Sequence, residues 1–413
     1  MNKPAIRFAG FTDAWEQRKL GELVDRVVRK NTNNESTLPL TISAQYGLVD
    51  QITYFNNRVA SRDVSNYYLV LNGEFAYNKS TSDGYPFGAV KRLDLYEKGV
   101  LSTLYIVFAS KKEQQIDSDY LTVFFDTDRW HKGVAERAAE GARNHGLLNI
   151  SAEDFFDIDL SVPNDIVEQK QIGAFIRQLD NLITLHQREY AKLVNIKASM
   201  LEKMFPKDGS AYPEVRFAGF TDAWEQRKLG DIGKARSGVG FPDADQGGVT
   251  GVPFFKVSDM NLDGNENEMI VANNYVTAEQ IADHRWSPIT ELPAIFFAKV
   301  GAAVMLNRKR LCRFPFLLDN NTMAYSLSPT KWDADFAKAL FGTVDLTSLV
   351  QVGALPSYNA GDVESMGIYL PSLFEQEQIG AFFKLLDNLI TLHQRKLEKL
   401  QNIKKSMLEK MFV

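Results

Sequence analysis

The chain has 413 residues, of which 45% are hydrophobic, 24% charged and 11% aromatic, and it carries a formal net charge of -5. This composition excludes a disordered or fibrous chain, and the length allows two or three domains that each bury a core. No apolar run approaches the roughly 20 residues that span a bilayer, and the first residues lack the apolar core of a signal peptide, so we expect a cytoplasmic protein with no membrane partner.

The chain opens on a segment that occurs twice. Residues 7–21, which read Arg-Phe-Ala-Gly-Phe-Thr-Asp-Ala-Trp-Glu-Gln-Arg-Lys-Leu-Gly, recur letter for letter at 216–230. Residues 168–205 recur with few changes at 375–412, whereas the stretches between the repeats are almost equal in length but show little similarity. The sequence therefore predicts two halves of one architecture, which suggests one kind of partner bound twice and two different things recognised.

The first variable stretch predicts a lobe of mixed strand and helix. Runs of β-branched and aromatic residues at 67–71, 74–77 and 104–108 are separated by turn residues. Polar residues at strand ends and on a loop carry donors and acceptors that match base edges or phosphates, although such residues are common on any loop and, taken alone, are more often solvated than in contact with bases. These candidates for DNA contacts are Ser43, Gln45, Tyr46, Asn78, Lys79, Ser80, Arg143 and Asn144.

A long helix is predicted over residues 168–204. Five heptads predict about 37 residues of helix, roughly 55 Å long at 1.5 Å per residue. Pro163 stands just ahead and marks the start of the helix. The heptad positions, which we expect to pack against another helix, are Ile172, Leu179, His186, Leu193 and Met200.

The second variable stretch predicts a lobe of the same fold with a different surface. Its strand-like runs are 253–257, 294–298 and 302–306. Cys312, the single cysteine, excludes an internal disulfide and a multi-thiolate metal site, and we expect it to be a small, half-buried hydrophobe. The candidate DNA contacts of this lobe are Lys256, Ser258, Asp259, Lys299, Arg308, Ser357, Tyr358 and Asn359.

The second long helix follows Pro371 and repeats the heptads of the first. Because both helices carry the same apolar stripe in one chain, we expect them to pack antiparallel with one lobe at each end; pairing of each helix with another chain is the alternative. At the helix midpoints, His186 and His393 are expected to form a polar layer that fixes the register, because other zinc ligands are missing. The heptad positions are Ile379, Leu386, His393, Leu400 and Met407.

Motifs of several enzyme classes are missing from the sequence. There is no glycine-rich loop for S-adenosylmethionine with an Asn/Asp-Pro-Pro-aromatic motif, and no P-loop. Ser237-Gly238-Val239-Gly240 is too short to be a dinucleotide fingerprint, and the five histidines form no metal-ligand cluster. The sequence therefore favours a binding protein over an enzyme.

Several motifs, each present twice and in order, resemble one family. They are Trp-Glu-Gln-Arg-Lys-Leu-Gly near the start of each half, the Pro followed by Glu-Gln-x-Gln-Ile-Gly at each helix start, Leu-Asp-Asn-Leu-Ile-Thr-Leu-His-Gln-Arg, and Ser-Met-Leu-Glu-Lys-Met-Phe. The chain resembles the specificity subunit of type I restriction–modification enzymes over essentially its whole length. Residues 42–47, 75–80 and 251–260 also look like parts of that family's target recognition domains.

The resemblance implies an α+β fold with two pseudo-twofold-related, mixed α/β target recognition domains separated by two long antiparallel helices that form a coiled coil. The helices would act as a ruler that sets the spacing between two DNA half-sites. The expected segments are 1–21, a first conserved repeat segment; 22–162, target recognition domain 1; 163–206, a central conserved helix; 207–230, a linker and the second conserved segment; 231–370, target recognition domain 2; and 371–413, a distal conserved helix.

The resemblance also implies function and partners. One recognition domain would read each half of a bipartite, asymmetric site in double-stranded DNA, while two methyltransferase subunits and two restriction subunits, which are motor and nuclease, would be recruited to it. S-adenosylmethionine, ATP and magnesium would then be bound by the partners and not by this non-catalytic chain. The alternatives are the recognition subunit of a fused restriction and methylation system and a coiled-coil scaffold that does not bind DNA.

Overall fold

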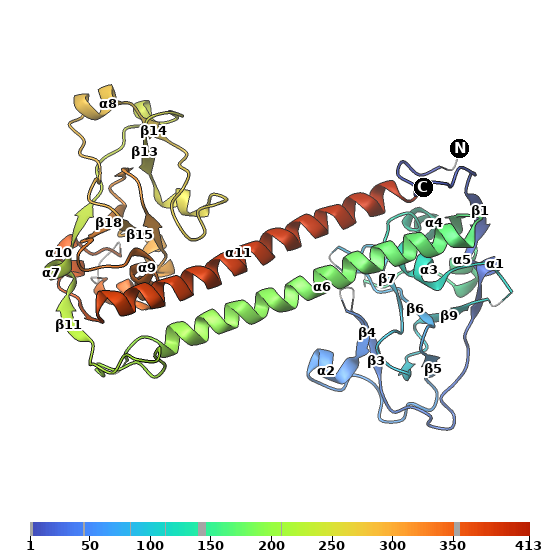
Figure 1. The fold of residues 1–413 in the computed structure, drawn as a ribbon. Helices are drawn as coiled ribbons and strands as arrows, with labels where there is room; N and C mark the ends of the chain where they lie inside the picture. The colour runs from blue at the N-terminus through green and yellow to red at the C-terminus, as the bar shows by residue number, and fades with distance from the viewer. Residues whose placement is uncertain are drawn as a thin grey trace. The chain divides into compact units, whose positions relative to one another are not determined.

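The computed structural model describes residues 3–43, 46–82, 84–111, 113–138, 146–207, 209–350 and 356–413. The chain divides into two compact units, one comprising Met1–His186 with Lys396–Val413 and the other Gln187–Arg395. Each unit therefore contains one lobe and a part of each long helix (Figure 1).

Unit 1 is built around a four-stranded antiparallel sheet of order β2-β9-β6-β7. Separate two-stranded sheets pair β1 with β10, β3 with β4, and β5 with β8. The strands are β1 (Glu16–Lys19), β2 (Val24–Arg26), β3 (Leu40–Ser43), β4 (Gly47–Asp50), β5 (Tyr68–Leu71), β6 (Phe75–Asn78), β7 (Ala89–Arg92), β8 (Lys98–Leu101), β9 (Ile106–Ser110) and β10 (Asp159–Val162). The helices of the lobe are α1 (Leu20–Leu23), α2 (Gln51–Phe55), α3 (Ser118–Phe125), α4 (His131–Arg137) and α5 (Ala152–Phe156).

Unit 2 has a four-stranded sheet of the same design, in the order β12-β18-β15-β16. Its second sheet differs from anything in unit 1, because β13 pairs antiparallel with β14 and parallel with β17. The strands are β11 (Glu225–Lys228), which pairs with β19 (Gly367–Leu370), β12 (Gly233–Ser237), β13 (Val252–Phe255), β14 (Tyr275–Val276), β15 (Ala294–Ala298), β16 (Lys309–Cys312), β17 (Leu317–Leu318) and β18 (Thr322–Leu327). The helices are α7 (Leu229–Ile232), α8 (Ala278–Asp283), α9 (Ala334–Thr343), α10 (Ala360–Glu364) and the 3-10 turns η2 (Asp243–Asp245), η3 (Val257–Asn261), η4 (Ala302–Leu306) and η5 (Leu346–Leu349).

One predicted strand is wrong. The apolar run at 302–306 forms the 3-10 helix η4 after Gly301, whose φ of 80° turns the chain out of the extended conformation. Met305 and Leu306 are 58% and 59% exposed, whereas Val304 is buried. The run was apolar without the burial that a central strand requires.

The two predicted long helices are confirmed as α6 (Ile166–Lys203) and α11 (Leu373–Lys410), with 38 residues each. Within each unit, the parts of α6 and α11 run antiparallel (Figure 1). In unit 1, Ile172 and Leu179 are buried, with Leu400 and Met407 packed against their cluster. In unit 2, the buried heptad positions are Ile379 and Leu386, and those packed against them are Leu193 and Met200.

The predicted histidine layer stays a prediction. His186 belongs to unit 1 and His393 to unit 2, and each is half-buried. The described residues hold no group of three or more potential metal ligands.

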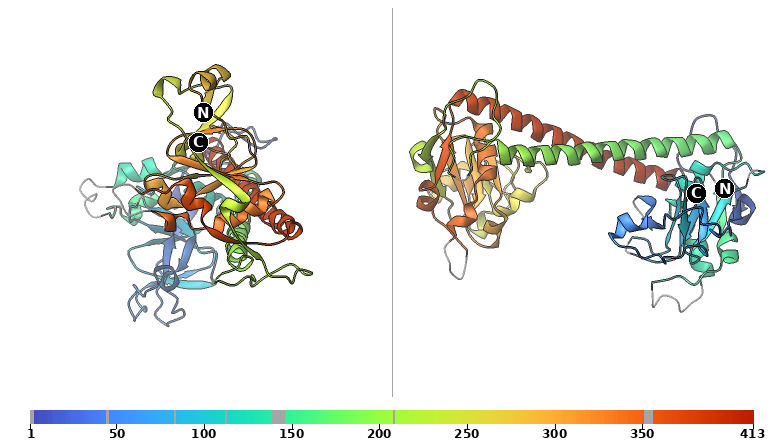
Figure 2. Two further views of the ribbon diagram at one scale, coloured as in Figure 1. Left: turned by 90° about the vertical axis from the view of Figure 1, so that its left-hand side faces the viewer. Right: turned by 90° about the horizontal axis from the view of Figure 1, so that it is seen from below.

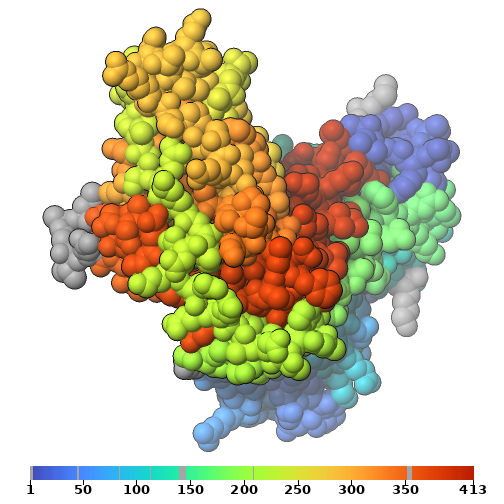
Figure 3. Space-filling model, turned by 60° about the vertical axis from the view of Figure 1, so that its left-hand side comes forward, coloured from blue at the N-terminus to red at the C-terminus, as the bar shows by residue number. Residues whose placement is uncertain are grey.

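The repeated segments carry the same contacts in both units. Trp15 is buried against Phe412, with ring centroids 6.1 Å apart and planes at 81°, and Trp224 is buried against Phe205 at 6.0 Å and 88°. The core of each lobe is therefore completed by a phenylalanine two residues beyond the end of the long helix that begins in the other unit. Figure 2 shows the end of α11 at the first lobe, and Figure 3 shows the yellow-green segment after α6 beside the red residues of α11 in unit 2.

The first sizeable helix of each lobe docks on a long helix in the same way. In unit 1 the backbone N–H of Asp117, the N-cap of α3, donates to Gln169 Oε1 at 2.8 Å. In unit 2 the backbone N–H of Asp333, the N-cap of α9, donates to Gln376 Oε1 at 3.0 Å. The contact thus recurs although the two lobes have different sequences.

Glycines in the long helices permit this close approach. A Cβ on Gly173 would lie 2.8 Å from Cβ of Asp119 and 2.9 Å from the backbone N of Tyr120. A Cβ on Gly380 would lie 2.2 Å from Oδ1 of Asp333. Both positions exclude a side chain because the lobe helix lies directly against them.

Cys312 is fully buried, and not half-buried as expected; burial raises the pKa of its thiol to about 12. The environment of the thiol therefore keeps it protonated and unreactive at neutral pH. None of the helices in the described ranges is long and apolar enough to cross a membrane.

Candidate nucleic-acid interface

The strand-end lysines Lys79 and Lys299 occupy equivalent places in the two lobes. Lys79 follows β6, and its backbone carbonyl accepts the N–H of Leu148 at 2.9 Å. Lys299 follows β15, and its carbonyl accepts the N–H of Tyr358 at 3.4 Å. Isolated bridges beside these bonds join Ser80 to Leu147 and Val300 to Ser357. In both lobes, a segment from the C-terminal part of the lobe thus lies at the end of a central strand.

The polar side chains at this end of the first lobe form only some of the hydrogen bonds that they can make. Lys79 is half-buried, and its Nζ donates to the carbonyl of Ile150 at 3.3 Å. Asn78 Oδ1 accepts the N–H of Ser80 at 3.0 Å, and Ser80 is exposed. The amide group of Asn78 and the hydroxyl of Ser80 are able to hydrogen-bond to an approaching ligand.

The β3–β4 turn gives a mixed result for its candidates. Ser43 is buried at the end of β3, and its hydroxyl accepts the N–H of Tyr46 at 3.2 Å, so Ser43 shapes the turn. Tyr46 is 62% exposed, with its ring available for stacking or for a hydroxyl contact. Gln45, Arg143 and Asn144 lie outside the described residues.

The candidates that follow β13 also separate into structural and exposed residues. Asp259 is fully buried, and its carboxylate accepts hydrogen bonds from the N–H of Lys256 at 2.6 Å and from the N–H and Nδ2 of Asn273 at 3.0 and 2.8 Å. Its carboxylate oxygens are occupied by hydrogen bonds within the lobe. This corrects the prediction that Asp259 faces DNA. Lys256 donates through Nζ to Gln246 at 3.1 Å, and Ser258 is exposed.

Two further candidates of the second lobe hold local structure. Tyr358 is buried, and its hydroxyl donates to the carbonyl of Ala298 at 2.6 Å. Asn359 is the N-cap of α10, where its side-chain Oδ1 accepts the N–H of Asp362 and its own backbone N–H donates to the Asp362 carboxylate. Ser357, which forms an isolated bridge with Val300, is half-buried.

The basic run after η4 contains one half-buried candidate, Arg308, and two neighbours, Lys309 and Arg310, whose side chains are bonded within the lobe. Arg308 donates through Nη1 to Asn261 Oδ1 at 2.7 Å, while its buried Nε has no hydrogen-bond partner within the described part of the chain. Lys309 donates to Asn307 Oδ1 at 2.7 Å, and Arg310 donates through Nε to the carbonyl of Asn265 at 2.7 Å. Of this run, Arg308 is the residue best placed to contact a phosphate.

Sequence reasoning missed Asp319, which lies beside the strand ends of the second lobe. Its side chain is 6% exposed, and Oδ1 accepts no hydrogen bond within the described ranges. Burial raises the pKa of this carboxyl group. Gly238 passes so close that a Cβ there would lie 1.9 Å from the Asp319 carbonyl oxygen. The glycine pattern at 237–240 was the signal in the sequence that could have indicated this site. Its glycine at 238 allows the backbone to pass close to Asp319.

Sequence reasoning also missed exposed aromatic residues in the first lobe. Tyr54 and Phe55 in α2 are 48% and 50% exposed, with ring centroids 5.0 Å apart. Aromatic rings on a lobe surface supply stacking faces, whereas the exposed amide, hydroxyl and ammonium groups supply hydrogen bonds to base edges and phosphates. The two lobes thus present different side chains on related frameworks, an arrangement that suits recognition of two different ligand segments.

Known proteins share this architecture. The profile of the family described as "Type I restriction modification DNA specificity domain" matches twice, over residues 13–195 and 221–402. The chain is similar to the type I restriction enzyme MjaVIII specificity subunit of Methanocaldococcus jannaschii, at 23% identity, covering 86% of this chain and 82% of that one. It is also similar to the putative MjaX specificity subunit of the same organism, at 22% identity over 95% and 92% of the two chains.

A solved structure supports the fold. The type I restriction-modification system S subunit from M. genitalium superposes with a TM-score of 0.61 and 14% sequence identity, over 100% of this chain and 99% of that chain. At this identity the likeness concerns the fold alone.

Proposed function

The chain belongs to the type I restriction modification DNA specificity family, and from this premise we propose that each lobe reads one half of a two-part, asymmetric DNA sequence. It is the specificity subunit of a type I restriction–modification system, a recognition subunit rather than a catalytic one, and it acts in a complex with DNA and other subunits of the system.

One observation carries the proposal of two half-sites. The central sheets β2-β9-β6-β7 and β12-β18-β15-β16 have one topology, and the segments 7–21 and 216–230 are identical, but the second sheets of the two lobes differ. Tyr46, Tyr54 and Phe55 are exposed in the first lobe, whereas Ser258 and Arg308 belong to a different surface in the second. A repeated framework with two different surfaces suits a target whose halves differ.

The proposed partners are two methyltransferase subunits and two restriction subunits. Leu185 and Leu392 are the same position of the helix repeat and are 52% and 46% exposed. Val167 and Phe374, also equivalent, are 51% and 62% exposed. Exposed apolar side chains at the same places in both copies support binding of one kind of partner twice.

The chemistry is assigned to those partners. S-adenosylmethionine would be bound by the methyltransferase subunits, which flip and methylate an adenine, and ATP and magnesium by the restriction subunits. The contribution of this chain is to select the DNA and hold both kinds of subunit on it. The cytoplasm, where cellular DNA is exposed in bacteria and archaea, is the proposed site of action.

A genome-wide map of methylated adenines tests the proposal. We compare cells with and without this gene, with the methyltransferase gene present in both. Loss of one two-part asymmetric motif on deletion is the expected result. An unchanged map, together with failure of the chain to co-purify with the methyltransferase, would contradict the proposal and favour a scaffold with another partner.

A further inference from the structure

An ion pair between the two long helices occurs in both units at equivalent positions of the repeat. In unit 2, Lys197 of α6 contacts Asp387 of α11, with Nζ 2.5 Å from Oδ1. In unit 1, Lys404 of α11 contacts Asp180 of α6, with Nζ 2.7 Å from Oδ1. Lys197 and Lys404 are the same repeat position, as are Asp180 and Asp387, so each unit contains the same aspartate–lysine pair.

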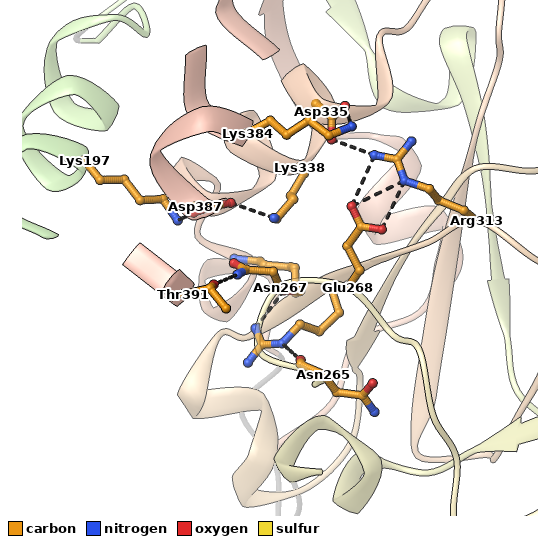
Figure 4. Close-up of polar contacts among 12 residues, drawn as sticks. Lys197, Asn265, Asn267, Glu268, Arg313, Asp335, Lys338, Lys384, Asp387 and Thr391 are labelled. Atoms are coloured by element: carbon orange, nitrogen blue, oxygen red, sulfur yellow. Dashed lines mark hydrogen bonds and ion pairs between the residues drawn. The ribbon is translucent and has the colours of Figure 1, made fainter. Parts of the chain in front are cut away.

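The lobes complete these pairs with opposite charges. In unit 2, Lys338 of α9 contacts Asp387, with Nζ 2.6 Å from Oδ2 (Figure 4). In unit 1, the lobe instead supplies an acid. Asp126 at the end of α3 binds Lys91 of its own lobe, with Oδ1 2.7 Å from Nζ, and its other oxygen, Oδ2, lies 3.6 Å from Nζ of Lys404. The first lobe thus contacts the lysine of the pair, and the second contacts the aspartate.

The lobe helices that supply these groups dock in the same register. Their N-caps Asp117 and Asp333 donate to equivalent glutamines of the long helices, as described above. Two residues after each cap, Asp119 pairs with Arg177 at 2.6 Å and Asp335 with Lys384 at 3.0 Å (Figure 4). The two lobes thus dock in the same register. They differ in the charge of the side chain that each places against the aspartate–lysine pair.

We propose that the repeated aspartate–lysine pair is a docking socket for the recognition lobes that accepts a lobe group of either charge. An acidic lobe residue binds its lysine, and a basic lobe residue binds its aspartate. The nearly identical helices can therefore carry lobes of unrelated sequence with the same aspartate–lysine pair. This inference concerns how the lobes are held and does not rest on the identity of the DNA.

Burial indicates which member of the pair holds the lobe. Asp387, between two lysines, has a side chain that is 9% exposed, while its helix partner Lys197 is 29% exposed. In unit 1, Lys404, between two carboxylates, is 20% exposed, and Asp180 is 43% exposed. Burial lowers the pKa of Lys404, but the carboxylates of Asp126 and Asp180 outweigh it and raise the pKa overall. The central, more buried group is the lysine in one unit and the aspartate in the other.

A pair carrying both charges avoids a cost that a single charge would impose. If the helices offered only a carboxylate, Asp126 would face a like charge while partly removed from water. If they offered only an ammonium group, Lys338 would face a like charge in the same way. The space beside the socket also differs, with a cavity of about 350 Å³ next to Lys404 and one of about 50 Å³ next to Lys197. The lobes thus share the charged contact without sharing the shape of the surrounding surface.

Four single substitutions in the full-length chain test the socket by hydrogen exchange of α3 and α9. Asp180→Asn and Lys404→Met both break the helix pair of unit 1, but only Lys404→Met also removes the long-helix contact of Asp126, which then keeps Lys91 of its own lobe as its partner. Lys197→Met and Asp387→Asn form the matched set in unit 2, where only Asp387→Asn removes the partner of Lys338. We expect Lys404→Met to accelerate exchange in α3 and Asp387→Asn in α9, each roughly tenfold, with little change for the other two variants.

Equal effects of the two members of a pair would overturn the proposal, because they would make the pair a link between helices only. A conversion experiment gives a second check. Thr122 follows the α3 cap by as many residues as Lys338 follows the α9 cap, so Asp126→Asn with Thr122→Lys changes the first lobe from an acidic to a basic contact. In that background we expect Asp180→Asn, and no longer Lys404→Met, to accelerate exchange in α3. Continued dependence on Lys404 would refute acceptance of either charge.

Discussion

Arg7 binds Glu168 through two contacts, with Nε 2.5 Å from Oε1 and Nη2 2.8 Å from Oε2, and the Glu168 side chain is fully buried. The Arg216 guanidinium binds Glu375 in the same manner at 2.6 and 2.7 Å. Each pair joins the repeated segment that precedes a lobe to the first turn of the long helix that follows the lobe. The beginning and end of each lobe are thus fastened together by one ion pair.

Loss of this fastening should destabilise one unit. We expect Arg7→Met to lower the free energy of unfolding of unit 1 by about 3 kcal/mol, because a buried carboxylate then has no cation. Urea unfolding monitored by hydrogen exchange in each unit measures the effect. The control is Arg26→Met, which removes an exposed pair with Glu153 and should cost less than about 1 kcal/mol. Equal losses in the two variants would contradict the importance of burial.

The helix glycines should resist replacement. Gly380→Ala places a Cβ 2.2 Å from Asp333 Oδ1, so we expect a loss of about 1–3 kcal/mol in the free energy of unfolding despite the better helix propensity of alanine. Gly342 of α9 has no atom within 4 Å of an added Cβ. Gly342→Ala should therefore stabilise the protein by up to about 1 kcal/mol. Thermal unfolding of the two variants checks the opposite signs, and a stable Gly380→Ala protein would be inconsistent with the observed approach of α9.

Stability should rise in mildly alkaline solution because of Lys309. Burial lowers the pKa of this lysine from 10.5 to about 8 in the folded protein. Between those values the unfolded chain binds more protons than the folded one, so the free energy of unfolding increases as pH rises from about 8 to about 10.5. Lys309→Met should remove this increase. Urea unfolding at several pH values gives the slopes, and an equal slope in both proteins would assign the effect to other groups.

The strand-end lysines should contribute to DNA binding. We expect Lys79→Ala and Lys299→Ala to weaken binding by the complex assembled with methyltransferase subunits, and to reduce the slope of log affinity against log salt by about one if each lysine contacts a phosphate. Lys309→Met, which removes a lysine bonded to Asn307, serves as the control for a loss of charge in the same lobe. Wild-type affinity in both alanine variants would leave these lysines as solvated residues.

Exchange of a whole lobe should separate the two halves of the target. Replacing residues 22–160 by the matching lobe of a relative should change one half of the methylated motif and preserve the other half. The joints at Gln169 and Gly173 lie outside the exchanged stretch and remain to receive the new lobe. Sequencing of methylated adenines gives the new motif, and a changed spacer with both halves intact would argue against one lobe for each half-site.

The repeated framework was predictable, because heptads, a duplicated tryptophan segment and strand-like runs are local signals. Burial of polar side chains was not. Asp259 and Tyr358 have the same donors and acceptors whether they face solvent or a backbone carbonyl, and only the fold shows that they are occupied. The contacts of Asp126 and Lys338 could not be predicted either, since the two residues differ in type and lie in lobes that do not align in sequence.

The backbone contacts beside the buried side chains of Phe205 and Phe412 have a further consequence. In unit 1 the N–H of Ile6 donates to the carbonyl of Lys410 at 3.0 Å, and in unit 2 the N–H of Val215 donates to that of Lys203 at 2.9 Å. The chain connects Lys203 to Val215 through a short loop, whereas no such loop connects Lys410 to Ile6. The two backbone contacts are nevertheless the same. The fold is thus indifferent to which of the two contacts is bridged by a loop.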